Sequence, residues 1–427
     1  MKKIAIISEH ASPLAMLGGI DSGGQNVYVA HLSRQLASMG YQVDVFTRQD
    51  SQGQARIVNW EDGVRVIRVP AGPACFVAKE DMLPLMEGFA AFMLRFARRA
   101  HVPYDLVHAN FFMSGLVAQR LKDKLGIPFV ITFHALGRVR RQCQGQDDAF
   151  PDRRFCIEQG LMQDAERIIA ECPQDQADMQ NLYGADPRRI DIIPCGFDQE
   201  EFWPVASDTR SQIGLSASEF VILQLGRMVP RKGVDNVIRA LALLRQREQV
   251  NARLLIVGGN SSEADPVATP EIGRLRALAQ ALGVERSVSF TGQRARAQLR
   301  TYYSAANVFV TTPWYEPFGI TPVEAMACGT PVIGSAVGGI KSTVVDGQTG
   351  FLVPPNDPAA LAQKLVWLHQ NPLAAQRMGW AGLRRANQHY TWRTVAQQVS
   401  QSYDAVLDRD SAMQLVGRYL EPTQAAG

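Results

Sequence analysis

WYEPFGITPVEAMACGTPVIGSAVGGIKSTVVDGQTGF, residues 314–351, contains the strongest indications of architecture in this 427-residue chain. It follows an apolar predicted strand, passes through a turn that contains Glu316, and continues into a predicted helix that carries Glu324. A second apolar strand then leads to the glycine pair Gly338 and Gly339. In a parallel sheet, this order brings a loop and a helix N-terminus to the carboxyl ends of the strands, where ligands bind and free backbone N–H groups hold anions.

Glu316 and Glu324 are separated by seven residues. If the segment between them is helical, the two carboxylates lie two turns apart on about one face, and that face can line a pocket. Apolar residues surround both glutamates: Trp314, Phe318, Ile320, Val323, Ala325, Met326 and Ala327. Carboxylates are seldom buried without bonding partners, and the hydroxyls of a polyol would supply such partners. The pattern therefore favours a polyol-binding pocket over the other interpretation, a surface turn before a solvated helix.

Apolar β-rich runs alternate with helical patterns along the whole chain, which predicts parallel sheets with helices on both faces. In the first half the predicted strands are 3–8, 41–47, 64–69, 104–110, 128–134, 167–171 and 189–194. In the second half they are 220–227, 252–259, 287–292, 305–312, 330–335 and 350–355. A chain of this length exceeds one ordinary hydrophobic core, so we expect two domains.

The polar, proline-containing segment 195–214 interrupts the periodicity and indicates an interdomain linker. We therefore predict an α/β fold of two Rossmann-like, doubly wound domains that face each other across a cleft. The predicted units are residues 1–197, residues 198–388 and a helical segment at residues 389–427.

Hydrophobic residues make up 46% of the chain and charged residues 20%, as in a soluble globular enzyme. The formal charge of +3 argues against nucleic-acid binding driven by overall charge. The six cysteines form no C-x-x-C motif, which indicates free thiols in a reducing compartment, so we expect a cytoplasmic protein.

The N-terminal residues MKKIAIISEH indicate a first strand, because their apolar run is too short for a signal peptide. No apolar stretch approaches the roughly 20 residues needed to span a bilayer. The sequence leaves peripheral membrane contact and the oligomeric state open.

The glutamate pair Glu316 and Glu324, with the motifs around it, resembles the retaining GT-B glycosyltransferases of glycosyltransferase family 4 (GT4). This family includes sucrose-phosphate synthase, sucrose synthase and the mycothiol-pathway glycosyltransferase, and the resemblance covers nearly the whole chain. It implies an acceptor site on the first domain, a nucleotide-sugar site on the second, and a last helix that crosses back to the first. It also implies that Glu316 holds sugar hydroxyls, that Glu324 holds the ribose, and that Phe318, Gly319 and Ile320 contact the donor.

A glycine-rich segment, GGIDSGGQNVYVAHLSRQLASMG at 18–40, follows the first strand and opens a helix. Gly23 and Gly24 allow the backbone to approach a ligand closely, and the helix N-terminus presents N–H groups to a phosphate. The spacing G-x-G-x-x-G is absent and Asp44 lies inside its strand, which argues against a Rossmann dehydrogenase. The resemblance implies that this loop contacts the donor diphosphate.

His134 ends a predicted strand on the ligand side of the first sheet, and by resemblance it contacts the donor sugar. Arg227 and Lys232 flank a turn just beyond a strand, where two cations can neutralise a leaving diphosphate. Arg294 also follows a strand, at the place where the family cradles the nucleotide base.

No metal-ligand spacing such as H-E-x-x-H occurs, so the expected reaction needs neither a metal nor another cofactor. Three further histidines, His10, His31 and His108, have no activating partner recognisable in the sequence, and we expect structural or acceptor-side roles for them.

Basic residues in three separate segments of the first domain, Lys79, Arg138 and Arg154, predict an anionic acceptor if they converge. By resemblance, Lys79 and Arg154 match positions that bind acceptor phosphate in the mycothiol branch, and the run HALGRVRR is similar to the sucrose-phosphate synthase branch. Asn26 and Asn110 complete the predicted acceptor side. The segment HANFFMSG departs from the family pattern H-x-H-Y-W, because Asn110 stands at the second histidine.

The resemblance implies transfer of a hexosyl group, expected to be glucose, from a UDP-sugar to a sugar phosphate or polyol phosphate with retention at the anomeric carbon. No covalent nucleophile is recognisable, so we expect front-side attack in which the leaving phosphate oxygen takes the acceptor's proton. Three alternatives stay open: a transferase with a lipid or polysaccharide acceptor, a nucleotide-sugar epimerase, and a non-catalytic sugar-nucleotide sensor. The sequence does not decide between UDP and ADP or GDP as the donor nucleotide.

Overall fold

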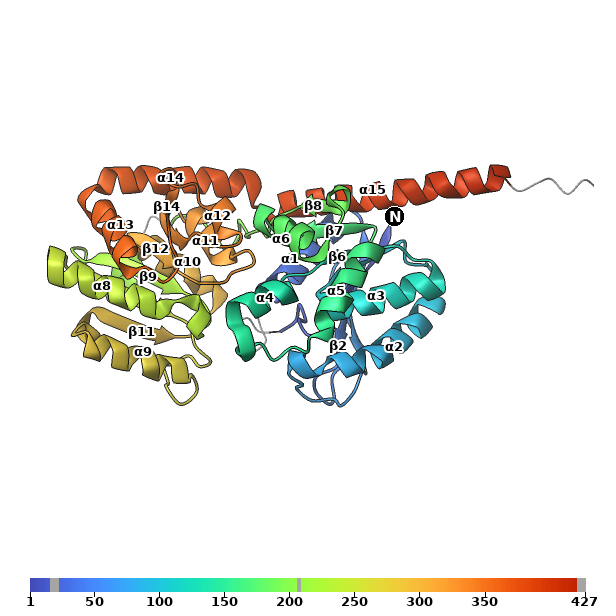
Figure 1. Ribbon diagram of the computed structural model, residues 1–427, viewed down its shortest axis with the longest axis horizontal. Helices are drawn as coiled ribbons and strands as arrows, with labels where there is room; N and C mark the ends of the chain where they lie inside the picture. The colour runs from blue at the N-terminus through green and yellow to red at the C-terminus, as the bar shows by residue number, and fades with distance from the viewer. Residues whose placement is uncertain (16–22, 206–208, 421–427) are drawn as a thin grey trace, which may run out of the picture.

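The computed structural model describes residues 1–15, 23–205 and 209–420, and these contain two sheets, each flanked by helices (Figure 1). In Figure 1 the first domain, coloured blue to green, lies on the right, and the second domain, yellow to orange, lies on the left. The predicted architecture of two doubly wound α/β domains is therefore confirmed.

The first sheet has eight strands in the order β3-β4-β2-β1-β5-β6-β7-β8. Its strands are β1 (Lys3–Ile7), β2 (Gln42–Arg48), β3 (Ile57–Glu61), β4 (Val64–Val69), β5 (Leu106–Asn110), β6 (Phe129–Thr132), β7 (Arg167–Ala170) and β8 (Ile190–Ile192). The helices of this domain are α1 (Gly24–Ser38), α2 (Met86–Arg98), α3 (Phe112–Leu125), α4 (Gly137–Gln144), α5 (Arg153–Asp164) and α6 (Pro173–Tyr183), with 3-10 turns η1 (Lys79–Asp81), η2 (Leu83–Leu85), η3 (Gly145–Asp147) and η4 (Pro187–Arg189).

Strand β3 is antiparallel to β4, so the expectation of purely parallel strands is wrong at this edge of the sheet. Along Ile57–Glu61, fully exposed residues alternate with partly exposed ones, and none is buried. An edge strand of this kind has no continuous apolar run, which is why the sequence pattern did not identify it.

The second sheet has six parallel strands in the order β11-β10-β9-β12-β13-β14. Its strands are β9 (Phe220–Leu225), β10 (Ala252–Val257), β11 (Val288–Gly292), β12 (Val308–Thr311), β13 (Val332–Ser335) and β14 (Gly350–Val353). The helices are α7 (Thr209–Gln212), α8 (Val234–Glu248), α9 (Pro270–Ala281), α10 (Arg296–Ala305), α11 (Ile320–Ala327), α12 (Ile340–Thr343), α13 (Pro358–Gln370) and α14 (Pro372–His389), with 3-10 turns η5 (Pro230–Lys232) and η6 (Glu285–Ser287).

The central strand β9 shows why its sequence, FVILQL, is apolar almost throughout. All six of its residues are buried. Val221 and Leu223 belong to the hydrophobic core on one face of the sheet, and Phe220 and Ile222 belong to the core on the other face. A strand covered by helices on both faces needs apolar residues at successive positions.

The chain crosses between the domains twice, and the two crossings are hydrogen-bonded to each other. Phe197 N donates to Tyr390 O at 2.8 Å, and Trp392 N donates to Phe197 O at 3.2 Å. The last helix, α15 (Trp392–Leu420), then packs against α1, so the end of the chain returns to the first domain (Figure 1).

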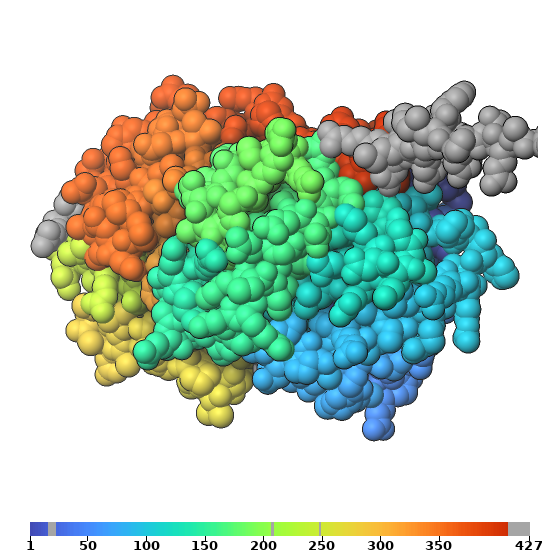
Figure 2. Space-filling view, turned by 45° about the vertical axis from the view of Figure 1, so that its right-hand side comes forward, coloured from blue at the N-terminus to red at the C-terminus, as the bar shows by residue number. Residues whose placement is uncertain are grey.

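The two domains meet along a seam, where the orange surface of the second domain adjoins the green surface of the first (Figure 2). Cys172 Sγ lies 3.6 Å from Pro317 O, and Lys341 Nζ donates to Gln174 Oε1 at 3.1 Å. Cys172 follows β7 and Pro317 follows β12, so the carboxyl ends of the two sheets lie opposite each other across this seam.

Candidate active site

Three turns of the second domain pack backbone against backbone at the carboxyl end of its sheet. A Cβ atom on Gly233 would lie 2.0 Å from Thr312 O, and one on Gly338 would lie 1.7 Å from Glu316 O. Both glycines have positive φ angles, +65° and +46°. Only glycine fits such positions, so the turns after β9 and β13 are held directly against the turn that carries Glu316.

Glu316 lies in the turn before α11 and not on the helix, which begins at Ile320. The expectation that Glu316 and Glu324 share one helical face is therefore wrong. Glu316 forms an ion pair with Lys232, and its Oε2 lies 3.7 Å from Arg231 Nη1. Arg231 Nη1 also donates to Tyr315 O at 3.0 Å, so this arginine joins η5 to the Glu316 turn.

The cations around Glu316 determine its charge. Burial alone would raise the pKa of Glu316, but Lys232, Arg231 and Arg227 outweigh burial and lower it. Burial lowers the pKa of Lys232, and the nearby charges of Arg231 and Arg227 lower it further. The Glu316 carboxylate raises this pKa but does not outweigh them. Three basic side chains surround one carboxylate, which leaves a positive field at the domain seam that suits a diphosphate.

Glu324 occupies a separate environment and is only 2% exposed. Its Oε2 accepts a hydrogen bond from Tyr303 Oη at 3.0 Å, and its Oε1 lies 3.0 Å from Arg296 Nη1. The predicted donor residue Arg294 lies elsewhere: its Nη1 donates to Ser262 O at 2.6 Å. Sequence reasoning assigned no role to Arg296, which lies two residues after Arg294 at the start of α10.

The glycine loop of the first domain reaches the second domain. A Cβ atom on Gly24 would lie 3.5 Å from Ile320 Cδ1, so the start of α1 lies beside the start of α11. Gly23 N donates to Asn26 Oδ1 at 2.9 Å, and Asn26 Nδ2 donates to Ser12 O at 2.9 Å. The amide of Asn26 thus fixes the loop; the preceding part of the predicted loop, residues 18–22, lies outside the described residues.

His134 and Asn110 lie together at the carboxyl ends of β6 and β5. His134 Nε2 is 3.0 Å from Asn110 Oδ1, and its Nδ1 is 2.7 Å from Glu171 Oε1. The ring packs edge-on against Tyr28, with centroids 4.9 Å apart. His134 also has a positive φ of 57°, a strained conformation for a non-glycine residue that tertiary contacts must maintain. Glu171, which holds the ring in place, was not identified from the sequence.

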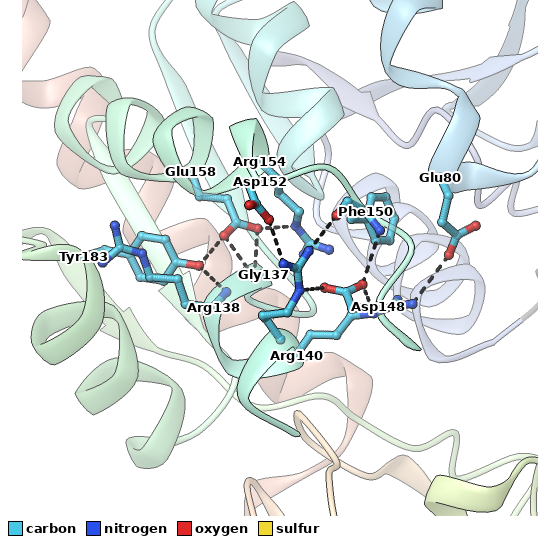
Figure 3. Close-up of polar contacts among 11 residues, drawn as sticks. Glu80, Gly137, Arg138, Arg140, Asp148, Phe150, Asp152, Arg154, Glu158 and Tyr183 are labelled. Carbon is cyan, nitrogen blue, oxygen red and sulfur yellow. Dashed lines mark hydrogen bonds and ion pairs between the residues drawn. The ribbon is translucent and has the colours of Figure 1, made fainter. Parts of the chain in front are cut away.

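The polar side-chain contacts of Arg154 are with residues of the first domain (Figure 3). Arg154 is completely buried, its Nε donates to Glu158 Oε1 at 2.7 Å, and its Nη2 donates to Ala135 O at 2.5 Å. Its guanidinium also lies 4.6 to 4.8 Å from the ring centroids of three phenylalanines, Phe111, Phe112 and Phe150. This arginine therefore anchors the backbone next to His134.

The three segments that carry the predicted acceptor residues do come together (Figure 3). Arg140 of α4 contacts Glu80 of η1, the turn that begins with Lys79, at 3.5 Å. Arg138 Nη1 donates to Leu182 O, and its guanidinium lies 5.0 Å from the Tyr183 ring. The segments converge, but Arg138, Arg140 and Arg154 are each bonded to acceptors of the first domain.

Two histidines lie next to carboxylates that the sequence did not reveal as partners. The expectation that His10 and His31 lack an activating partner is therefore wrong. His10 Nδ1 lies 2.8 Å from Glu9 Oε1, and His31 Nδ1 lies 3.4 Å from Asp198 Oδ2. In the described part of the chain, one set of potential metal ligands has its atoms within 4.8 Å of one another: His31, Asp198 and Glu201. Glu201 is ion-paired with Arg296, which competes with any metal there.

A pocket of about 280 Å³ opens at the seam beside Glu316. It is lined by α4 and α6 of the first domain and by the turns at Trp314 and Gly338 of the second. Asp175 lies in its wall, and burial raises the pKa of this carboxyl to about 8. The seam thus leaves room for a small molecule between the two sheets.

Within residues 1–15, 23–205 and 209–420, no helix is both long enough and apolar enough to cross a membrane.

Two family models match the chain. The model described as glycosyl transferases group 1 matches residues 206–385, and the glycosyl transferase 4-like domain matches residues 23–196. The D-inositol 3-phosphate glycosyltransferase of Corynebacterium efficiens is 36% identical over 409 residues, which cover 94% of this chain and 95% of that protein. The protein of the same name from Kineococcus radiotolerans is 36% identical over 423 residues, covering 96% and 97%.

Solved structures share the fold. Sucrose-phosphate synthase from Thermosynechococcus elongatus superposes with a TM-score of 0.87 at 34% identity and covers 96% of this chain and 100% of its own. The Anabaena protein Alr3699/HepE, solved in complex with UDP-glucose, superposes with a TM-score of 0.72 at 20% identity, covering 95% and 100%.

Proposed function

The chain belongs to the group 1 glycosyl transferases and has the GT-B fold, and we propose that it is a retaining, metal-independent transferase that moves glucose from UDP-glucose to a phosphorylated sugar or polyol. The observation that carries this proposal is the cluster of Arg227, Arg231 and Lys232 around Glu316 at the domain seam. A cluster of this charge favours the departure of a diphosphate in the transition state.

The two glutamates lie in separate environments, which supports different proposed roles in donor binding. Glu316, held by Lys232 in the turn that packs against Gly338, is proposed to bind the hydroxyls of the transferred sugar. Glu324, held by Tyr303, is proposed to bind the ribose. The choice of UDP-glucose is supported by the ligand named with the Anabaena neighbour, which shares the fold.

In the proposed reaction, the acceptor hydroxyl attacks the anomeric carbon on the face from which the diphosphate leaves. The bond from that carbon to the phosphate oxygen breaks as the new glycosidic bond forms, and the acceptor proton moves to the departing phosphate oxygen. Lys232 and Arg227 stabilise the charge that develops on the diphosphate. His134, fixed by Glu171 and Asn110, positions the sugar. This scheme needs no covalent nucleophile and no metal ion.

The phosphorylated acceptor is supported by the relatives and by the first domain. The curated relatives are named for D-inositol 3-phosphate, and the neighbour at 34% identity is a sucrose-phosphate synthase. The contact of Arg140 with Glu80 joins the segments of Lys79 and Arg138, and the ion pair of Arg141 with Asp152 joins the segment of Arg154 to α4. All six cysteines are free, which supports a cytoplasmic location for the reaction.

Calorimetric titration with UDP, combined with turnover measurements, tests the two glutamate roles. Glu324→Gln is expected to weaken UDP binding, because the ribose loses an acceptor. Glu316→Gln is expected to bind UDP nearly as the wild type does and to lose turnover, because the sugar is misplaced. If both variants bind UDP like the wild type, the ribose assignment is wrong; if Glu316→Gln retains full turnover, the sugar assignment is wrong.

A further inference from the structure

Arg296 connects the proposed ribose site to the interdomain linker. It is the first residue of α10, and its Nη1 lies 3.0 Å from Glu324 Oε1. Its Nε forms an ion pair with Oε2 of Glu201, which lies in the linker. Its guanidinium lies 4.9 Å from the ring centroid of Phe202, the next linker residue. The side chain is therefore fixed on three sides.

One nitrogen of this guanidinium is left over. Arg296 Nη2 is buried and has no hydrogen-bond partner among the residues that the structure describes. A buried donor without a partner is unfavourable unless a ligand or a water molecule satisfies it. Because Nη2 belongs to the same planar group as Nη1, it lies within a few ångströms of the Glu324 carboxylate.

Helix α10 aligns this group with a second Glu324 partner. Arg296 and Tyr303 are seven residues apart, so they project from one face of α10 toward α11. Tyr303 Oη donates to Glu324 Oε2, and the Tyr303 ring packs edge-on against Phe202 at 5.9 Å. Each carboxylate oxygen can accept a further hydrogen bond, so Glu324 still has capacity for a ligand hydroxyl.

The charges at this place favour a neutral polar ligand. Two carboxylates, Glu324 and Glu201, share the one guanidinium, so the cluster has no excess positive charge for an anion. A hydroxyl group both donates and accepts, so it suits a carboxylate beside an unused N–H. A ribose hydroxyl has this chemistry.

We infer that Arg296 is a ribose-binding residue: one ribose hydroxyl donates to Glu324 and accepts a hydrogen bond from Arg296 Nη2. This inference rests on the proposed function, in which Glu324 holds the ribose. Glu201 acts as a positioning residue, because its pairing with Nε fixes the plane of the guanidinium. The consequence is discrimination between ribose and deoxyribose, since a missing hydroxyl leaves both Glu324 and Arg296 without their partner.

Calorimetry with UDP, 2′-deoxy-UDP and 3′-deoxy-UDP tests the inference on the full-length protein. The wild type is expected to bind UDP about tenfold or more tightly than one of the two analogues. Arg296→Lys and Arg296→Met are expected to reduce this ratio about threefold or more, with little change in the affinity for the analogue. Arg296→Lys retains a positive charge between the two carboxylates and serves as the measurement if Arg296→Met does not fold.

Arg300→Met is the matched control. Arg300 lies one turn further along α10, with its guanidinium 3.9 Å from the Trp203 ring centroid, outside the proposed site. This variant is expected to retain the wild-type ratio.

If Glu324→Gln weakens UDP binding, two outcomes overturn the inference and leave the proposed function standing. In the first, the wild type binds UDP and both analogues equally well. In the second, a folded Arg296 variant keeps the wild-type ratio of UDP affinity to analogue affinity. If Glu324→Gln leaves UDP binding unchanged, the ribose is not at Glu324. In that case the donor assignment of the proposed function fails together with the inference.

Discussion

Glu316 illustrates how a single residue depends on its neighbours for its chemistry. Its carboxylate is partly enclosed, with 12% of the side chain exposed, and stays ionised because Lys232 and Arg231 contact it. Those cations are in turn positioned by Gly233, whose close approach to Thr312 leaves no space for a side chain. The positive field at the proposed diphosphate site therefore depends on the fold of three turns as well as on the charged residues themselves.

Lys232→Ala is expected to lower turnover about a hundredfold or more, because a contact to the departing diphosphate is lost in the transition state. Stability is expected to change little, since Arg231 and Arg227 remain near Glu316. Steady-state kinetics and thermal unfolding measure the two effects. Lys364→Ala, which removes a lysine over the Phe351 ring, is the control. Near-normal turnover of Lys232→Ala would contradict the proposed role of Lys232 in stabilising the departing diphosphate.

Arg154→Ala is expected to lower the free energy of unfolding by about 3–5 kcal/mol, because Glu158 is left as a buried carboxylate without its cation. Denaturant titration measures this loss. The double variant Arg154→Met with Glu158→Gln removes both charges and is expected to regain part of it.

The same double variant tests the predicted acceptor role of Arg154. If Arg154 binds the acceptor phosphate, the double variant is expected to have a higher acceptor Michaelis constant than the wild type, while its donor hydrolysis remains close to the wild-type rate. An acceptor Michaelis constant equal to that of the wild type would contradict this role.

At the residue scale, the sequence predicted which residue types lie near the site better than it predicted where their side chains point. The pattern identified Glu316, Lys232 and Glu324 by their motifs. It did not separate Arg294 from Arg296, because these residues lie only two positions apart at the start of α10 and only tertiary packing decides which one reaches Glu324. Partners from distant segments, such as Glu171 for His134, also require the folded chain.

At the element scale, the last helix is fastened to the first sheet by a buried polar contact. His108 on β5 is completely buried, with Nδ1 2.7 Å from Tyr403 Oη of α15 and Nε2 2.9 Å from Thr132 Oγ1. Burial, aided by the nearby His134, lowers the pKa of His108 to about 3. The native protein therefore keeps this imidazole neutral, whereas the unfolded chain protonates it near pH 6.5.

Because of His108, the free energy of unfolding is expected to decrease as the pH is lowered. Below about pH 6.5 the unfolded state binds a proton that the native state does not bind, so acidification favours unfolding by about 1.4 kcal/mol per pH unit down to about pH 3. Between pH 7 and pH 4.5, wild-type stability is expected to fall about 2–3 kcal/mol more than that of His108→Gln. Asp175, whose pKa is raised to about 8, contributes with the opposite sign in both proteins and cancels from the difference. Equal pH slopes in urea titrations would show that His108 is not responsible.

The helices and strands themselves were largely predictable, because continuous apolar runs such as β9 and β10 have few alternatives in a chain that alternates strand and helix. The exceptions have physical causes. Strand β3 is exposed and lies at the edge, and α11 begins at Ile320 because the Glu316 turn is held by its neighbours in a non-helical conformation.

At the scale of the whole molecule, the two domains are joined where Phe197 and Trp392 pair, and a Cβ atom on Gly196 would lie 2.8 Å from the Trp392 ring. His31 of α1 stacks on Trp392 at 5.3 Å and faces Asp198 of the linker. Close to this junction, Arg296 joins the linker residue Glu201 to Glu324. The proposed donor site is therefore connected to the place where the domains are joined.

Activity is expected to survive an excess of EDTA, because Arg227, Arg231 and Lys232 supply the positive field at the proposed diphosphate site. Product formation before and after chelation and dialysis measures this. Complete loss of activity, restored by magnesium or manganese, would contradict metal independence.

The central claim is transfer with retention to a phosphorylated acceptor, and the direct test is product analysis. The purified protein is incubated with UDP-glucose and matched pairs of acceptors, each sugar or polyol with and without its phosphate. Mass spectrometry identifies the product, and NMR determines its anomeric configuration. We predict a glucoside of a phosphorylated acceptor that keeps the α configuration of UDP-glucose. A β-linked product, a preference for the neutral acceptors, or epimerisation of the donor without transfer would contradict the account.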